Sequence, residues 1–164
     1  MDPDRLSDAL HERFDAKTAA REKALPAARR SIRASANAIR AVHRGEFATA
    51  RSLIADSRAA LDEGTDGVTP HPDVRFAGYL LDAEKEYAEA NLTCALVAGE
   101  DLPAPDVLGV GDAPYLNGMA ETIGEGRRHI LDLLRIGDAE KAERILATLE
   151  PLLLYSNAHP LACR

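Results

Sequence analysis

The sequence has little aromatic character. Phe, Tyr and Trp together make up 4% of its 164 residues and tryptophan is absent, although hydrophobic residues of all kinds reach 46%. Strands favour aromatic and β-branched residues, whereas alanine and leucine favour helices. No segment alternates apolar and polar residues for long enough to predict a strand. The composition therefore disfavours a β-sheet and predicts an all-α protein with an aliphatic core.

The sequence also lacks the marks of secreted and membrane-spanning proteins. Its two cysteines, Cys94 and Cys163, are too few for a disulfide framework and have no metal-ligand spacing. No apolar run reaches the roughly 18 residues that a membrane-spanning helix needs. The first residues, MDPDRLSDAL, lack the basic and apolar regions of a signal peptide. We therefore expect an intracellular, cytoplasmic protein without a membrane segment.

The periodicity of apolar residues predicts one domain, 1–164, built from helices. The expected helices cover residues 3–44, 46–62, 73–98 and 113–135, and a further helix begins at Asp138. Pro26 is expected to kink or divide the first of them. Segments 63–72 and 99–114 are rich in Pro and Gly and predict loops, the second with a short turn near Val107. The prediction is an antiparallel bundle of five to seven helices joined by short loops.

The net charge of −7 is distributed unevenly along the chain. Residues 21–44 contain seven basic residues and one acid, which gives this segment a charge of +6 and leaves −13 for the rest. A basic helix face on an acidic protein is typical of a surface that binds phosphate groups. The alternative is a solvated face whose arginines pair with acids of a neighbouring helix or subunit. Charge alone leaves both interpretations open.

Two predicted helices each carry a pair of glutamates, Glu86 with Glu89 and Glu121 with Glu125. Residues three or four apart project from the same face of a helix. If the two pairs face each other, their like charges need a cation, and an all-oxygen site suits Mg²⁺ or Mn²⁺. Two glycines on the later helix, Gly118 and Gly124, are expected to let another backbone or a ligand come close. The alternative is that the four acids only solvate two helices.

Three segments of the chain resemble motifs of one protein family. The basic segment RRSIRASANAIRAVHR is similar to an N-terminal helix pattern, with matches at Arg29, Ser35, His43 and Arg44. EYAEA, at residues 86–90, resembles EYVEA. YLNGMAETIGEGRR resembles YLLGVADLTGELMR, with matches at Tyr115, Leu116, Gly118, Ala120, Gly124, Glu125 and Arg128. In the order and spacing of these motifs, from about residue 19 to about residue 156, the chain resembles the translin and translin-associated factor X (TRAX) family.

This resemblance implies an all-helical subunit of seven helices that assembles into a hollow octamer. The chain is shorter than eukaryotic members, which indicates a compact prokaryotic or archaeal-type form. The TRAX branch of the family is a metal-dependent endoribonuclease. Translin itself lacks the acids of that branch and mainly binds nucleic acid. The resemblance therefore predicts either a nuclease or a nucleic-acid-binding protein, depending on the acids.

Carried over by position, the acids of the nuclease branch fall on Glu86, Glu89, Glu121 and Glu125 as catalytic residues and ligands of Mg²⁺ or Mn²⁺. Glu121 replaces the Asp of the family, so its carboxylate stands one methylene further from the helix. The acid set favours a Mg²⁺-dependent endonuclease of single-stranded RNA, in which activated water attacks the phosphodiester and Glu125 orients or deprotonates it. The alternatives are a non-catalytic translin-like oligomer that binds single-stranded RNA or DNA, and a structural helical oligomer without a nucleic-acid role.

The resemblance also suggests a role for the basic helix face. Basic surfaces of the family contact the RNA backbone, and the candidates in this chain are Arg29, Arg30, Arg33 and Arg40. No aromatic residues are interleaved with them, so we expect contacts to phosphate with little sequence preference. The expected partners are single-stranded RNA, with DNA as a further candidate, and other copies of the chain.

Overall fold

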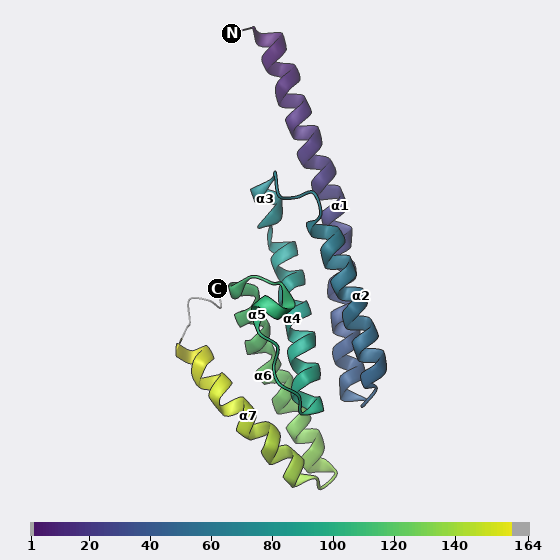
Figure 1. Cartoon of the computed structure of the whole chain (residues 1–164), viewed down its shortest axis with the longest axis vertical. Helices are drawn as coiled ribbons and strands as arrows, with labels where there is room; N and C mark the ends of the chain where they lie inside the picture. The colour runs from purple at the N-terminus through teal and green to yellow at the C-terminus, as the bar shows by residue number, and fades with distance from the viewer. Residues whose placement is uncertain (1, 159–164) are drawn as a thin grey trace.

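The computed structural model describes residues 2–158, which form seven helices and no strand (Figure 1). The helices are α1 Pro3–His43, α2 Phe47–Thr65, α3 Pro72–Arg75, α4 Gly78–Ala98, α5 Pro105–Leu108, α6 Asp112–Arg135 and α7 Ala139–Ala158. The all-helical prediction is confirmed, as is the short turn near Val107, which is α5. Cys163 and the end of the tail lie outside the described residues.

The first helix, α1, is continuous over 41 residues. Its N-cap residue, Asp2, accepts a hydrogen bond from the Asp4 backbone N–H at 3.2 Å. Pro26 lies inside the helix, so the expectation that it divides the helix is wrong. The reason is packing: Pro26 itself is exposed, while Ala24 and Ala27 on either side of it are fully buried and hold the helix in place.

The helix predicted over residues 73–98 is interrupted near its start. α3 ends at Arg75, and the chain turns before α4 begins at Gly78. Phe76 lies at this turn and is 66% exposed, although the apolar period of the sequence passes through it. The buried stripe of α4 begins instead at Leu80 and continues through Tyr87.

Helices that follow each other through short loops pack antiparallel, as predicted, in the pairs α1–α2 and α6–α7 (Figure 1). Helices α4 and α6 instead run parallel, because residues 99–111 carry the chain back along the bundle before α6 begins. Along the pair, Gly111 lies beside Glu84, Gly118 beside Glu89, and Gly126 beside Leu96. This arrangement places the two glutamate pairs on neighbouring helices at similar heights.

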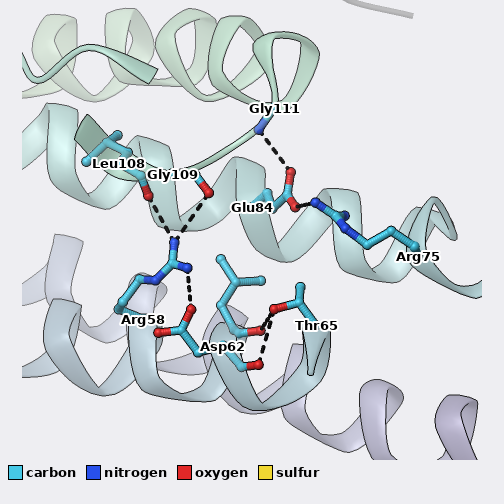
Figure 2. A network of polar contacts seen from close by, with 9 residues as sticks. Arg58, Asp62, Thr65, Arg75, Glu84, Leu108, Gly109 and Gly111 are labelled. Carbon is cyan, nitrogen blue, oxygen red and sulfur yellow. Dashed lines mark hydrogen bonds and ion pairs between the residues drawn. The ribbon is translucent and has the colours of Figure 1, made fainter. Parts of the chain in front are cut away.

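Two side chains fasten this returning connection to the bundle (Figure 2). Arg58 of α2 donates a hydrogen bond to the backbone oxygen of Leu108 at 2.9 Å. Glu84 of α4 is 2% exposed, pairs with Arg75 at 2.7 Å and accepts the backbone N–H of Gly111 at 3.2 Å. The connection therefore has a fixed path, which determines where α6 begins.

The N-terminal part of α1 extends beyond the bundle (Figure 1). Residues 2–16 are exposed, and the apolar stripe of Leu6, Leu10 and Phe14 is 45%, 40% and 58% exposed. No other element of the described chain covers this stripe. None of the described helices has the length and apolar content needed to cross a membrane.

Candidate functional site

Gly118 allows α6 to lie against α4. A Cβ atom at this position would stand 2.6 Å from the Lys85 backbone oxygen and 2.9 Å from the Glu89 backbone nitrogen. Side-chain carbons do not approach backbone atoms so closely, so the contact requires glycine. Thr122, one turn further along α6, is fully buried and donates to the Gly118 oxygen at 2.9 Å. Gly124, by contrast, faces open space and makes no close approach.

Three of the four predicted acids meet at this contact. Glu86, Glu89 and Glu121 each offer one carboxylate oxygen, and the three atoms lie within 4.8 Å of one another. We call these three residues the acid cluster. Glu89 is 7% exposed, Glu86 is partly buried and Glu121 is exposed. The cluster is therefore closed on the Glu89 side and open to solvent on the Glu121 side.

Burial raises the pKa of the Glu89 carboxyl to about 8. Its hydrogen bond to Glu121 and the negative charges of Glu121, Glu86 and Glu125 act in the same direction. A carboxyl group with this pKa is mostly protonated at pH 7. The acid cluster is therefore a place of strong negative potential, where a positive charge is stabilised.

Lys85 brings a positive charge to the acid cluster. Its Nζ atom lies 2.8 Å from a Glu121 oxygen and 3.2 Å from a Glu86 oxygen. Burial acts to lower the pKa of Lys85, but the hydrogen bonds to Glu121 and Glu86 outweigh it and raise the pKa above its ordinary value. Sequence reasoning missed this residue, because a lysine next to a glutamate is common on helix surfaces. Its only signal was its position directly before the EYAEA segment.

Glu125 stands beside the acid cluster but is not part of it. Its Oε2 atom accepts a hydrogen bond from Nε2 of His43, the last residue of α1, and lies 3.8 Å from Nη1 of Arg128. The His43 side chain is 8% exposed and that of Glu125 is 25% exposed. The structure thus brings three predicted acids together and holds the fourth next to them through a histidine.

The donor set of the acid cluster fits a hard divalent cation. Mg²⁺ and Mn²⁺ prefer carboxylate oxygens, and the cluster offers three of them within a small space. Burial and, to a smaller extent, the neighbouring carboxylates raise the pKa of Glu89, and a bound cation would offset both effects. Glu86, Glu89 and Glu121 are therefore the residues that could hold the ion. Their roles as ligands remain a prediction.

The four predicted nucleic-acid-binding arginines are all exposed on α1, but their surroundings differ. Arg30 pairs with Glu63 of α2 at 2.5 Å, so its charge is balanced within the chain. Arg40 donates to the neutral side chain of Asn37 at 2.7 Å. Within the described residues, Arg29 and Arg33 form no ion pair.

Helical geometry separates the same arginines. At 100° per residue, Arg29, Arg33 and Arg40 fall within about 40° of one another, whereas Arg30 lies about 100° from Arg29. We call Arg29, Arg33 and Arg40 the basic ridge. Local pairing with acids, the alternative interpretation of the basic segment, is thus seen at Arg30, whereas the residues of the basic ridge form no ion pair within the described chain. The role of all four arginines in binding nucleic acid stays a prediction.

The site and fold together define an all-helical protein in which two parallel helices carry an acid cluster. No family model and no curated protein matches the chain. Two solved structures do. The structure of the AfC3PO–duplex RNA complex matches with a TM-score of 0.84 and 27% identity, over 95% of this chain and 80% of that chain. The crystal structure of apo-NeC3PO matches with a TM-score of 0.68 and 18% identity, over 95% of this chain and 98% of that chain.

C3PO is a complex of the translin and TRAX family. The chain therefore has the translin/TRAX-family fold, as the resemblance of its motifs predicted.

Proposed function

We propose that this chain is a metal-dependent endoribonuclease of the TRAX type that works as a homo-oligomer. The observation that carries the proposal is the meeting of Glu86, Glu89 and Glu121 across the α4–α6 contact. The likeness to a C3PO structure in complex with duplex RNA supports RNA as the substrate. The proposed oligomer is the octamer that the family resemblance implies.

The chemistry divides between the cation and the side chains. A Mg²⁺ or Mn²⁺ ion held by the acid cluster supplies positive charge for the phosphoryl oxygens and acidifies water. Hydrolysis forms a bond between a water oxygen and phosphorus and breaks one ester P–O bond. Glu125 orients the attacking water and takes its proton, because its carboxylate is close enough to the cluster for its charge to act on the Glu89 carboxyl. Solvent returns a proton to the leaving oxygen.

A cleavage assay on labelled RNA, with Mg²⁺ and with EDTA, tests the proposal. The Glu125→Ala variant is expected to fold and assemble normally and to lose cleavage. Glu143→Gln is the matched control, because it removes the charge of an exposed glutamate on α7, away from the acid cluster. Normal cleavage by a well-folded Glu125→Ala protein contradicts the proposal.

A non-catalytic RNA-binding oligomer is the second candidate. The observation that favours it is Lys85, which already balances charge at Glu86 and Glu121. Calorimetric titration with Mg²⁺ and Mn²⁺ separates the candidates. Cation binding that is lost in the Glu89→Gln variant supports the nuclease, whereas RNA binding with neither cation binding nor cleavage supports the second candidate.

The basic ridge is the proposed contact for the RNA backbone. Replacing Arg29 and Arg33 together by Gln is expected to weaken binding alike for all sequences and to flatten the slope of log affinity against log salt by about 0.7 to 1.4 for a single strand. Arg30→Gln is the matched control, because Arg30 lies on the same helix but pairs with Glu63. An unchanged slope means that the ridge does not carry RNA. The same titration on duplex RNA and DNA identifies the preferred nucleic acid.

The exposed stripe on α1 supports the proposed assembly. Leu6, Leu10 and Phe14 follow each other at intervals of four residues, so they lie on one face of a helix that the described chain leaves uncovered. Leu10→Glu is expected to dissociate the oligomer, measured by analytical ultracentrifugation. An unchanged mass shows that another surface makes the assembly.

A further inference from the structure

His43 occupies a rigid position at the end of α1. Its neighbours Ala41 and Val42 are 0% and 1% exposed, and Gly45, with a φ of +75°, ends the helix just after it. The backbone of His43 is therefore fixed by packing on one side and by a glycine turn on the other. Its ring reaches α6 and contacts Glu125, a residue 82 positions further along the chain.

The His43 ring forms one hydrogen bond within the described residues, and its partner is Glu125. A carboxylate oxygen can only accept a hydrogen bond, so Nε2 of His43 carries the proton and donates it to Oε2 of Glu125. The other ring nitrogen, Nδ1, is buried and has no partner in the described part of the chain. A buried imidazole is costly unless it is hydrogen-bonded, and the bond to Glu125 is the compensation that the structure shows.

Other basic groups near Glu125 hold it less firmly. Arg128 lies 3.8 Å away, and its side chain is 63% exposed, so it is free to move in solvent. The ring of His129 is 6.0 Å from the ring of His43, and no hydrogen bond joins His129 to Glu125 within the described residues. The orientation of the Glu125 carboxylate therefore depends chiefly on His43.

We propose that three of the four acids are cation ligands and that the fourth, Glu125, acts on the attacking water. Glu86, Glu89 and Glu121 hold the cation, and His43 is a positioning residue that keeps Glu125 out of the ligand shell and directed at the attacking water. The chemical roles in this division rest on the proposed nuclease function. The geometry does not depend on that function, because the oxygens of the acid cluster lie within 4.8 Å of one another and Glu125 lies outside this group.

Two variants of His43 separate hydrogen bonding from packing. His43→Gln retains an N–H donor near the position of Nε2, whereas His43→Leu fills similar space without a donor. We expect His43→Leu to lower kcat by about 10- to 100-fold, the usual effect of removing an outer-shell partner, with KM and Mn²⁺ affinity unchanged. His43→Gln is expected to recover most of that loss. His129→Leu is the matched control, and its kcat is expected to stay at the wild-type value.

A titration with Mn²⁺ tests the division without any cleavage. We expect Glu125→Gln to bind Mn²⁺ as tightly as the wild-type protein does and Glu121→Gln to bind it at least tenfold more weakly, as loss of a ligand implies. Loss of Mn²⁺ affinity in Glu125→Gln overturns the division, and so does an unchanged kcat in His43→Leu. If the wild-type protein cuts no RNA, the proposed function fails while the titration still decides the division. Glu125→Gln also keeps the test valid if His43→Leu does not fold.

Discussion

Two helix contacts in this molecule are built from small residues and differ in their electrostatics. In the α1–α2 contact, polar groups are matched: the hydroxyl of Ser57 lies 2.8 Å from those of Ser31 and Ser35. Lys23 pairs with Asp66 at 2.7 Å at the edge of the same contact. In the α4–α6 contact, three carboxylates meet, and the pKa of the buried one is raised to about 8.

The difference indicates which contact serves stability and which serves function. Lys85 pairs with Glu86 and Glu121, but the buried Glu89 carboxyl lowers the stability of the folded chain once it ionises, so a fold selected for stability alone has no use for it. Strongly perturbed acids are instead common where a ligand or cation binds. Four substitutions test the comparison.

The largest effect is expected for Gly118→Ala. The added Cβ meets backbone atoms of α4 at 2.6 and 2.9 Å and cannot be accommodated unless the helices separate. We expect a loss of about 3 kcal/mol in the free energy of unfolding, the upper range for overpacking, together with weaker cation binding.

Gly124→Ala is the control on the same helix, where nothing lies within 4 Å. It is expected to be neutral or to stabilise by up to about 1 kcal/mol. Urea denaturation of both variants measures the difference.

Glu89→Gln is expected to stabilise the cation-free protein at alkaline pH by about 2 kcal/mol. This is less than the roughly 5 kcal/mol that the full pKa shift corresponds to, because the acid cluster is open to solvent on the Glu121 side. The raised pKa means that the folded state keeps a proton that the unfolded state loses, so stability falls as the pH rises from about 4.5 to about 8. The loss of stability is absent below this pH window and complete above it.

The Gln variant has no ionisable group at this position, so it removes the loss of stability and flattens the pH profile of thermal unfolding. With Mg²⁺ present the order reverses, because only the wild-type protein gains from binding. A profile parallel to that of wild type contradicts the raised pKa.

Ser57→Ala is expected to cost about 1–2 kcal/mol, because it leaves the buried hydroxyls of Ser31 and Ser35 without their shared partner. Replacing all three serines by alanine is expected to cost less than the sum of the three single changes, because no orphaned hydroxyl then remains. Additive costs from denaturant unfolding show that the three hydroxyls do not act together.

The smallest effect is expected for Arg30→Gln. The side chains of Arg30 and Glu63 are 44% and 50% exposed, so their ion pair is screened by water. We expect a change below about 0.5 kcal/mol in unfolding free energy, reduced further by salt. A larger loss in thermal unfolding shows that the matched charges of the α1–α2 contact stabilise the fold more than surface pairs usually do.

The sequence predicted the helices well, because periodicity is a local property. Spacing also singled out the three acids that meet, Glu86, Glu89 and Glu121, while the roles of all four acids stay predictions. It also predicted that a glycine allows close approach, although Gly118 does this and Gly124 does not. The sequence does not separate them, since both are glycines in the interior of one predicted helix and each lies three residues from Glu121. Only the position of α4 distinguishes them.

The parts that sequence reasoning missed depend on residues far apart in the chain. The parallel course of α4 and α6 follows from how residues 99–111 are fastened by Arg58 and Glu84. The contact of His43 with Glu125 joins the end of α1 to α6. The contact of Lys85 with the acid cluster could not be predicted, because its partner Glu121 lies 36 positions away in the sequence. Phe76 fits the apolar period of the predicted helix but lies at the turn between α3 and α4, where helical periodicity does not predict burial.

The returning connection between α4 and α6 also has a consequence for the kinetics of folding. The α1–α2 and α6–α7 hairpins close through residues 44–46 and 136–138, whereas the acid cluster forms only after residues 99–111 have folded back. Contacts that close longer loops form later, so the cluster is expected to be absent from the folding transition state. A cation bound there then slows unfolding and leaves refolding nearly unchanged. Stopped-flow measurements with and without Mg²⁺ are expected to show a lower unfolding rate constant with the ion and a similar refolding rate constant, so that the ion makes the native state kinetically more stable.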